Sequence, residues 1–344
     1  MESIHFAQHL LAWYDRNARD LPWRHQKDPY AIWLSEVMLQ QTQVSTVIPY
    51  YNRFLARFPT LEILSEADDQ EVLKLWEGLG YYRRARLFLQ GVREVSEKYD
   101  GRLPEDYQTL ASLPGVGSYM AGALASIAYN RPAPAVDGNV IRVVTRVLAC
   151  GEDPASPKTR RMIEEWIMRH IPSERAGDFN QAMMELGAML CRVKEPQCDE
   201  CPVRTDCRAS QLNPELFPIK KPVKRVPVEH RAVYIVNDGR RLCFRQRTES
   251  LLHNLWEYPN MLIENDQEEN HAWAADFFGC DLSYVYKGEA SQTFTHLRWE
   301  MKIYQGIWPQ GVPTPKREDI GWFLPDEVEK LAKAGFVKRV DRVR

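Results

Sequence analysis

The chain has 344 residues, of which 44% are apolar and 27% are charged, and its formal net charge is −2. This length exceeds what one hydrophobic core usually organises, so we expect two domains. The near-neutral charge excludes a general electrostatic attraction to nucleic acid, and any such binding has to come from local patches. There is no apolar run of the ~18 residues that a membrane span needs and no signal-peptide pattern, which predicts a cytoplasmic protein without a membrane partner.

The first half of the chain has the periodicity of α-helices. Between residues 3 and 191, apolar residues recur every three to four positions, most clearly in GYYRRARLFLQGVREVSEKY. Similar runs cover 30–42, 44–58, 69–78, 138–149, 156–171 and 178–190, and prolines fall between them. We therefore predict an all-α domain over residues 1–217.

The second half changes to the period of two that is typical of strands. LRWEMKIYQGIW alternates apolar and polar residues, and Asp238-Gly239 separates two strand-like runs as a hairpin turn does. Helical runs at 268–279 and 325–335 accompany these strands, which predicts an α+β domain over 230–344. The proline-rich and basic segment 218–229 is the predicted linker.

Four of the seven cysteines lie close together in the sequence. Because we expect the protein to be in a reducing compartment, clustered thiols indicate metal ligands rather than disulfides. Cys191, Cys198, Cys201 and Cys207 are separated by six, two and five residues. Four thiolates in so short a loop can hold one metal centre. A [4Fe–4S] cluster is favoured over a zinc ion, because a structural zinc site usually pairs two C-x2-C units and only one is present.

The stretch LPGVGSYMAG joins two helical runs through Gly115 and Gly117. Glycines let the backbone approach a partner, and the second helix begins with free amide groups that suit a phosphate. A plain helix–helix connection explains the hairpin equally well. The stretch also places Tyr119 where a tight turn accepts almost any residue.

Two carboxylates stand in settings that favour chemistry. Glu36 lies among apolar residues in WLSEVMLQQTQV, where a carboxyl group has a raised pKa and can hold a proton near neutral pH. Asp137 precedes a predicted helix. The simpler alternatives are an exposed helix position for Glu36 and an N-cap for Asp137. A protonated acid that faces an ionised one is the pair that cleaves a glycosidic bond.

Taken together, these stretches resemble the helix-hairpin-helix DNA glycosylases with an iron–sulfur loop, and within them the MutY-type adenine glycosylase family. LPWR, SEVMLQQTQV, GLGYY, LPGVG-x-Y, AVDGN and the C-x6-C-x2-C-x5-C loop occur in order along the chain. A β-rich second domain with LWEYP and FTH is similar to the Nudix-like domain of that family. The resemblance implies a multidomain protein whose helical glycosylase domain carries a [4Fe–4S] cluster and precedes an α+β Nudix-like domain.

The resemblance also implies roles for single residues. Glu36 protonates the leaving adenine, and Asp137 stabilises the oxocarbenium-like sugar with support from Tyr119 and Asn139. The residues implied to contact adenine or DNA are Arg24, Gln41, Thr42, Tyr81, Gly115, Gly117 and Gln181, and those implied to recognise 8-oxoguanine are Phe294, Thr295 and His296. Some family members carry glutamate at the position of Gln181, and many have serine at that of Thr295.

The implied partner is double-stranded DNA with an 8-oxoguanine:adenine or guanine:adenine mispair, bound by a monomer. A bifunctional glycosylase/lyase similar to endonuclease III is the alternative, but it needs a lysine where this chain has Tyr119. A non-catalytic mismatch binder would not need Glu36 and Asp137. A Nudix phosphohydrolase would need a G-x5-E-x7-R-E-x-x-E-E box, which residues 228–344 lack.

Overall fold

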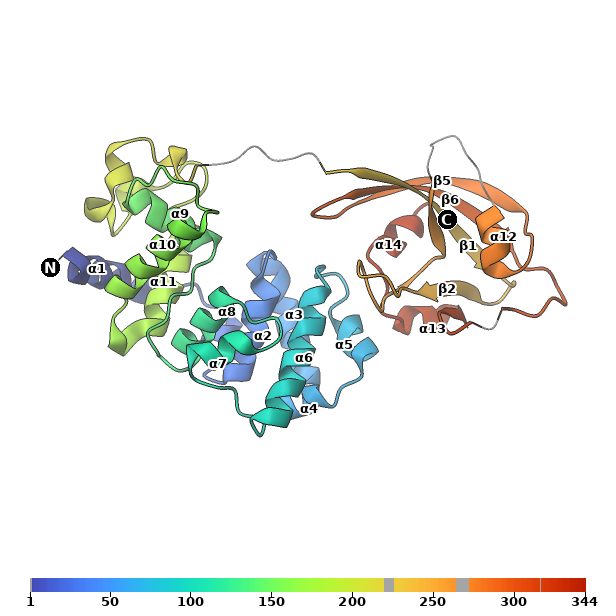
Figure 1. The fold of residues 1–344 in the computed structure, drawn as a ribbon, viewed down its shortest axis with the longest axis horizontal. Helices are drawn as coiled ribbons and strands as arrows, with labels where there is room; N and C mark the ends of the chain where they lie inside the picture. Colours follow the sequence, from blue (N-terminus) through green and yellow to red (C-terminus); the bar gives the residue numbers. More distant parts are fainter. Residues whose placement is uncertain (1, 220–225, 264–271, 316) are drawn as a thin grey trace. The chain divides into compact units, whose positions relative to one another are not determined.

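The computed structural model describes residues 2–219, 226–263, 272–315 and 317–344. Its chain divides into two compact units, one formed by residues 1–66 and 86–222 and the other by residues 67–85 and 223–344 (Figure 1). The predicted N-terminal domain therefore contains a segment, 67–85, that groups with the second unit. Half of the predicted linker, residues 220–225, lies outside the described residues.

The first unit is all-α, as predicted. Its helices are α1 (Glu2–Asn17), α2 (Pro29–Leu39), α3 (Val44–Arg57), α4 (Leu61–Ser65), α6 (Arg83–Lys98, which begins in the segment of the second unit), α7 (Tyr107–Ser112), α8 (Ser118–Ala123), α9 (Gly138–Val147), α10 (Pro157–His170) and α11 (Ala176–Met189). Shorter turns are η1 (Pro22–Arg24), the π-helical η2 (Leu124–Ala128), η3 (Ser173–Arg175), η4 (Cys198–Glu200), η5 (Arg204–Asp206), η6 (Arg208–Gln211) and η7 (Pro214–Leu216).

Helices α2 and α6 show how the local sequence positions the core of this unit. Along α6, the predicted apolar stripe from Ala85 to Val95 is buried. Helix α2 is apolar on every side and is buried from Tyr30 to Met38, so other helices surround it. It begins sharply because Asp28 accepts a hydrogen bond from Tyr30 N and Pro29 fits the first turn.

The second unit contains a mixed sheet with helices beside it. Its strands are β1 (Val228–Asn237), β2 (Leu242–Gln246), β3 (Trp256–Glu257), β4 (Asn260–Ile263), β5 (Tyr284–Thr293), β6 (Arg298–Ile307) and β7 (Ile320–Phe323). Their order is β3-β2-β1-β6-β5, with β4 also paired to β1 and β7 to β2. Strands β1 and β6 are parallel in the register Val228↔Arg298 to Asn237↔Ile307, and β5 is antiparallel to β6.

The helices of the second unit are α5 (Asp69–Leu75), α12 (Ala272–Phe278), α13 (Pro325–Lys330) and α14 (Val337–Val340). The hairpin at Asp238-Gly239 is confirmed, because Asn237 pairs with Leu242. Part of the predicted helix 268–279 lies outside the described residues, and the helix predicted at 325–335 ends earlier, at Lys330.

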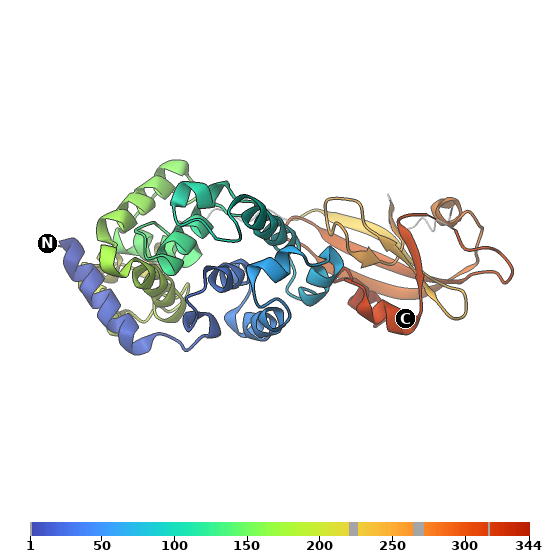
Figure 2. The same ribbon diagram turned by 90° about the horizontal axis from the view of Figure 1, so that it is seen from below.

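The alternation predicted for β6 is only half correct. Trp299, Met301 and Ile303 are buried on one face, as expected, but Tyr304 on the other face is also only 2% exposed. Tyr304 belongs to an apolar cluster with Tyr234 and with Phe277 of α12, whereas Trp299 packs against Phe336 next to α14. Side chains therefore pack against both faces of the sheet. Figure 2 shows the twisted strands of this sheet with a C-terminal helix, drawn in red, beside them. Within the described part of the chain, no helix is both long and apolar enough to cross a membrane.

Candidate active site

Glu36 is a buried acid in the middle of α2. The residue is 7% exposed, and its Oε2 accepts a hydrogen bond of 2.5 Å from the Tyr119 hydroxyl. Burial raises its pKa to about 7; the charge of Asp137 adds to this rise, while the Tyr119 hydrogen bond and the charge of Arg24 oppose it. Glu36 is thus not an exposed helix position, and it can carry a proton near neutral pH.

Asp137 is the N-cap of α9 and also faces the site. Its Oδ1 accepts a hydrogen bond of 2.7 Å from Val140 N, and its Oδ2 accepts one of 2.8 Å from Asn139 Nδ2. Burial raises its pKa, and these two hydrogen bonds hold it back. The cap interpretation and the active-site interpretation are therefore compatible, because the cap uses one oxygen and leaves the group close enough to influence Glu36.

Tyr119 has a different hydrogen-bond partner from the one that the resemblance implied. Its hydroxyl donates to Glu36 rather than to Asp137, and it also lies 3.8 Å from Met184 Sδ. Burial and the neighbouring carboxylates raise the pKa of the phenol well above its usual value, so it stays a donor. Tyr119 reaches Glu36 because α8 lies beside α2 (Figure 1).

Two glycines allow the close packing that brings these groups together. A Cβ on Gly122 of α8 would lie 2.0 Å from Pro134 O, in the segment that leads to Asp137. A Cβ on Gly187 of α11 would lie 2.6 Å from Asn139 Cβ. The same segment is held by the buried Asn180, whose Nδ2 donates to Ala133 O at 2.8 Å. Sequence reasoning did not single out these residues, because their role depends on neighbours that are distant in sequence.

Arg24 is anchored by a residue that the sequence analysis missed. Its Nη2 donates to Glu185 Oε2 at 2.8 Å, and Arg19 donates to the same carboxylate. Glu185 is buried on α11, and Gln181 lies one turn earlier on that helix and is partly exposed. The sequence did hold a signal for Glu185: it follows Gln181 by four residues, so both lie on the same face of the helix.

Two residues that the resemblance places at the DNA have an unusual backbone. Gln41 and Tyr81 adopt positive φ angles of 58° and 48° without being glycine, and both side chains are exposed. Such conformations cost about 1–3 kcal/mol and are often found at functional sites. Thr42 follows Gln41 directly and is partly exposed.

Tyr81 and Thr295 meet within the second unit. Thr295 Oγ1 donates to the Tyr81 hydroxyl at 3.2 Å, although 214 positions separate them in the sequence. Thr295 and His296 are exposed, whereas Phe294 is partly buried and packs edge-on against Trp299 at 4.9 Å. In the loop 294–296, Phe294 is therefore packed, Thr295 is exposed but bonded to Tyr81, and His296 is exposed.

The helix hairpin has the geometry expected from its glycines. Gly115 has a φ of +75°, and a Cβ there would lie 2.8 Å from Leu87 Cβ of α6. Gly117 is the N-cap of α8, and space is open around it. The turn therefore packs against α6 on one side and exposes backbone on the other, and phosphate binding stays a prediction.

The four clustered cysteines are free thiols that lie near one another. Cys191, Cys198 and Cys207 each raise the pKa of Cys201, although burial is the larger cause and brings it to about 12. Among the described residues, no group of three or more His, Cys, Asp or Glu side chains is placed to hold a metal ion. The buried Arg146 donates to Cys191 Sγ at 3.3 Å, which suits a sulfur that carries negative charge.

Arg142 and Arg146 have structural roles, because hydrogen bonds within the protein hold both guanidinium groups. Arg146 is 2% exposed and donates to the carbonyls of residues 192, 193 and 217. Arg142 donates to Cys191 O and to Asn139 Oδ1, both at 2.8 Å. Because Asn139 donates to Asp137, hydrogen bonds connect the cysteine loop with the acid pair.

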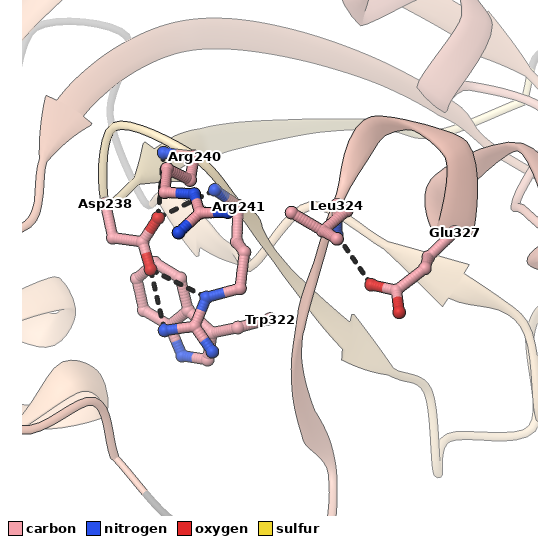
Figure 3. A pocket seen from close by; sticks show the side chains of 6 residues that line it. All are labelled: Asp238, Arg240, Arg241, Trp322, Leu324 and Glu327. Atoms are coloured by element: carbon pink, nitrogen blue, oxygen red, sulfur yellow. Dashed lines mark hydrogen bonds and ion pairs between the residues drawn. The ribbon is translucent and has the colours of Figure 1, made fainter.

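A pocket of about 440 Å³ lies elsewhere, at the β1–β2 turn (Figure 3). It is lined by Asp238, Arg240, Arg241, Trp322, Leu324 and Glu327, none of which is a predicted site residue. Asp238 accepts hydrogen bonds from the Arg241 guanidinium and from the amides of the turn, and Glu327 accepts one from Leu324 N. These bonds stabilise the turn and the start of α13.

Both halves of the chain are similar to known protein families. Residues 34–169 match the HhH-GPD superfamily base excision DNA repair proteins, and residues 231–340 match the NUDIX domain. An adenine DNA glycosylase of Rattus norvegicus is 35% identical over 98% of this chain and 77% of its own length. The chain belongs to the adenine DNA glycosylase family. A member from Buchnera aphidicola subsp. Baizongia pistaciae is 34% identical over 77% of this chain and 76% of its own length.

Solved structures support the same family at the level of the fold. A thermostable thymine-DNA glycosylase aligns with a TM-score of 0.57 and 27% identity over 61% of this chain and 97% of that chain. An endonuclease III–DNA complex aligns with a TM-score of 0.51 over 60% of this chain and 93% of that chain. Its 24% identity shows a shared fold and says nothing about lyase activity. The chain is thus a DNA glycosylase, an enzyme that hydrolyses N-glycosidic bonds.

Proposed function

We propose that this adenine DNA glycosylase family member removes adenine that is mispaired with 8-oxoguanine or guanine in duplex DNA. It acts as a monofunctional enzyme of base excision repair, and as a cytoplasmic monomer bound to DNA. The observation that carries the proposal is the acid pair: Glu36 has a pKa of about 7 and lies within the electrostatic influence of Asp137. Loss of an adenine anion is difficult. The pair lowers the barrier in two ways, because one acid protonates the leaving base and the other stabilises the sugar cation.

Each proposed step of adenine excision uses Glu36, Asp137 or a side chain that holds one of them. Glu36 donates its proton to the adenine ring as the C1′–N9 bond breaks, and the electron pair leaves with the base. The carboxylate of Asp137 stabilises the sugar cation that forms. Asn139 and Val140 N orient Asp137, and Tyr119 orients Glu36. Water then attacks C1′ and leaves an abasic site.

Recognition of the two bases uses different parts of the chain. Arg24 lies on η1, which packs against α2, and Gln181 lies on α11, which packs against α9. In this proposal both side chains contact the extruded adenine. Gln41, Thr42 and Tyr81 contact the duplex on the 8-oxoguanine side, and wedging there offsets the cost of flipping the base. Gly115 and Gly117 bring backbone amides to a phosphate.

Single-turnover incubation with a duplex that carries one 8-oxoguanine:adenine mispair tests this function. We expect adenine loss without strand cleavage, and cleavage only after alkali is added. Strand cleavage without alkali would favour the lyase alternative. A lyase needs an amine that forms a Schiff base with the sugar, and the phenol of Tyr119 cannot form one. Binding without base loss would favour a mismatch binder.

The cysteine loop fits an iron–sulfur cluster. Its four free thiols lie near one another, and Arg146 donates to one of them. We propose that Cys191, Cys198, Cys201 and Cys207 hold a [4Fe–4S] cluster, which would tie the loop together beside α9. The protein purified without oxygen should be yellow-brown and contain about four iron and four sulfide per chain. Stoichiometric zinc without iron would contradict this assignment.

The loop 294–296 should confer the preference for 8-oxoguanine over guanine. Thr295→Val combined with His296→Ala in the full chain removes two exposed polar groups, including the hydroxyl that bonds to Tyr81, and leaves Phe294 packed on Trp299. We expect adenine removal from guanine:adenine to persist and the preference for 8-oxoguanine:adenine to fall by about tenfold or more. The exposed Thr293→Val serves as the matched control. An unchanged preference in the double variant would exclude the loop from recognition.

A further inference from the structure

Glu185 is a buried carboxylate that takes no direct part in the proposed chemistry. Its side chain is 1% exposed. Its Oε1 accepts from the Arg19 backbone amide, Arg19 Nε and Arg24 Nη1, at 2.8 to 3.1 Å. Its Oε2 accepts from Arg19 Nη2 and Arg24 Nη2, both at 2.8 Å. A carboxylate with so many charge-assisted hydrogen bonds holds both guanidinium groups in a fixed position.

These contacts keep Glu185 ionised. Burial alone would raise its pKa, but the hydrogen bonds from Arg19 and Arg24 bring it down to about 2. Glu185 therefore carries its negative charge throughout the pH range in which Glu36 titrates.

Arg24 is immobilised on its other sides as well. Its Nη1 donates to Arg19 O at 2.7 Å, and its guanidinium lies 5.4 Å from the centre of the Tyr14 ring. Its Nε is buried and has no hydrogen-bond partner among the described residues. The position of Arg24 is thus fixed, and its buried Nε remains as a donor for another group.

The charge of Arg24 reaches Glu36. Arg24 lowers the pKa of Glu36, against the effects of burial and of Asp137. The charged and titratable groups that face Glu36 are Tyr119 from α8, Asp137 before α9 and Arg24 from η1; those that face Tyr14 beside Arg24 are Glu185, Asp178 and Arg175. Arg19 and Arg24 carry two positive charges and Glu185 one negative charge, so the trio contributes +1.

We infer that Glu185 is a positioning residue for excision: it fixes Arg24 beside Glu36 and offsets the charge of the two arginines, so that Glu36 keeps its proton. Without that negative charge, the trio would contribute +2 and would favour the ionised form of Glu36. The inference rests on the proposed role of Glu36 as the general acid.

The test is the pH dependence of single-turnover adenine excision in the full-length protein. Glu185→Gln raises the charge of the trio to +2, and Arg19→Gln lowers it to zero. We expect the alkaline limb of the rate profile to move to lower pH in the first variant and to higher pH in the second, each by about one unit. The double variant restores +1, so its limb should return to the wild-type position. Glu105→Gln, which breaks an exposed pair with Arg131, is the control and should not move the limb.

The outcomes separate this inference from the function on which it rests. If Glu185 had a purely structural role, Glu185→Gln would lower the excision rate by the same factor at every pH. That result would overturn the inference, and so would an unmoved alkaline limb in Arg19→Gln. Arg19→Gln decides the question if Glu185→Gln does not fold, because the Arg19 side chain is 37% exposed and its loss is tolerated more readily. Absence of excision by the wild-type protein would overturn the proposed function itself.

Discussion

Glu36→Gln should bind a mispair duplex about as tightly as the wild-type protein does and should remove adenine at least about 1000-fold more slowly. Glutamine can keep a hydrogen bond with Tyr119, but an amide has no proton of the required acidity to give to the base. Rates are measured under single-turnover conditions, and binding by the anisotropy of a labelled duplex.

The wild-type pH profile checks the same role. Protonated Glu36 is the reactive form, so the rate should fall tenfold per pH unit above the pKa of about 7. Ionised Asp137 is also required, and because its pKa is raised, the rate should fall again on the acid side, below neutral pH. A profile with no alkaline limb, or a near-normal rate in Glu36→Gln, would remove Glu36 from the mechanism.

Asp137→Asn should lower the excision rate by about 100- to 1000-fold, because it removes the negative charge that stabilises the sugar cation. The substitution is well matched to the structure. Asparagine caps helices as well as aspartate does, so α9 should keep its N-terminal hydrogen bond from Val140 and the protein should keep its melting temperature within a few degrees. Far-UV circular dichroism during heating measures this.

Residual activity in Asp137→Asn carries a second signature. The charge of Asp137 contributes to the raised pKa of Glu36, so its removal should move the alkaline limb to lower pH. A wild-type rate in this variant would mean that Asp137 is only a helix cap. A slow rate with an unmoved limb would mean that the two acids do not interact as the structure indicates.

The elements that carry these acids could be predicted from the sequence because their signals are local. The apolar residues that flank Glu36 argued against an exposed position, and the periodicity of α6 indicated which of its residues face the core. The spacing from Gln181 could have indicated that Glu185 shares its helix face, but its pairing with Arg24 could not be predicted, because 161 positions separate the two residues. Tyr304 illustrates another limit: a period of two identifies the faces of a strand but not whether a second layer covers the outer one.

The segment 67–85 has to wait for its packing partners while the chain is being synthesised. Its partners are made last: Gln70 bonds to Asn254 O, Lys74 to Leu331 O and Tyr82 to Lys333 O. At ~5–20 residues per second, α5 leaves the ribosome tens of seconds before those carbonyls exist. An interrupted chain that ends near residue 222 would therefore retain a segment that belongs to the missing unit. We expect such a product to be degraded rather than to persist as a smaller enzyme.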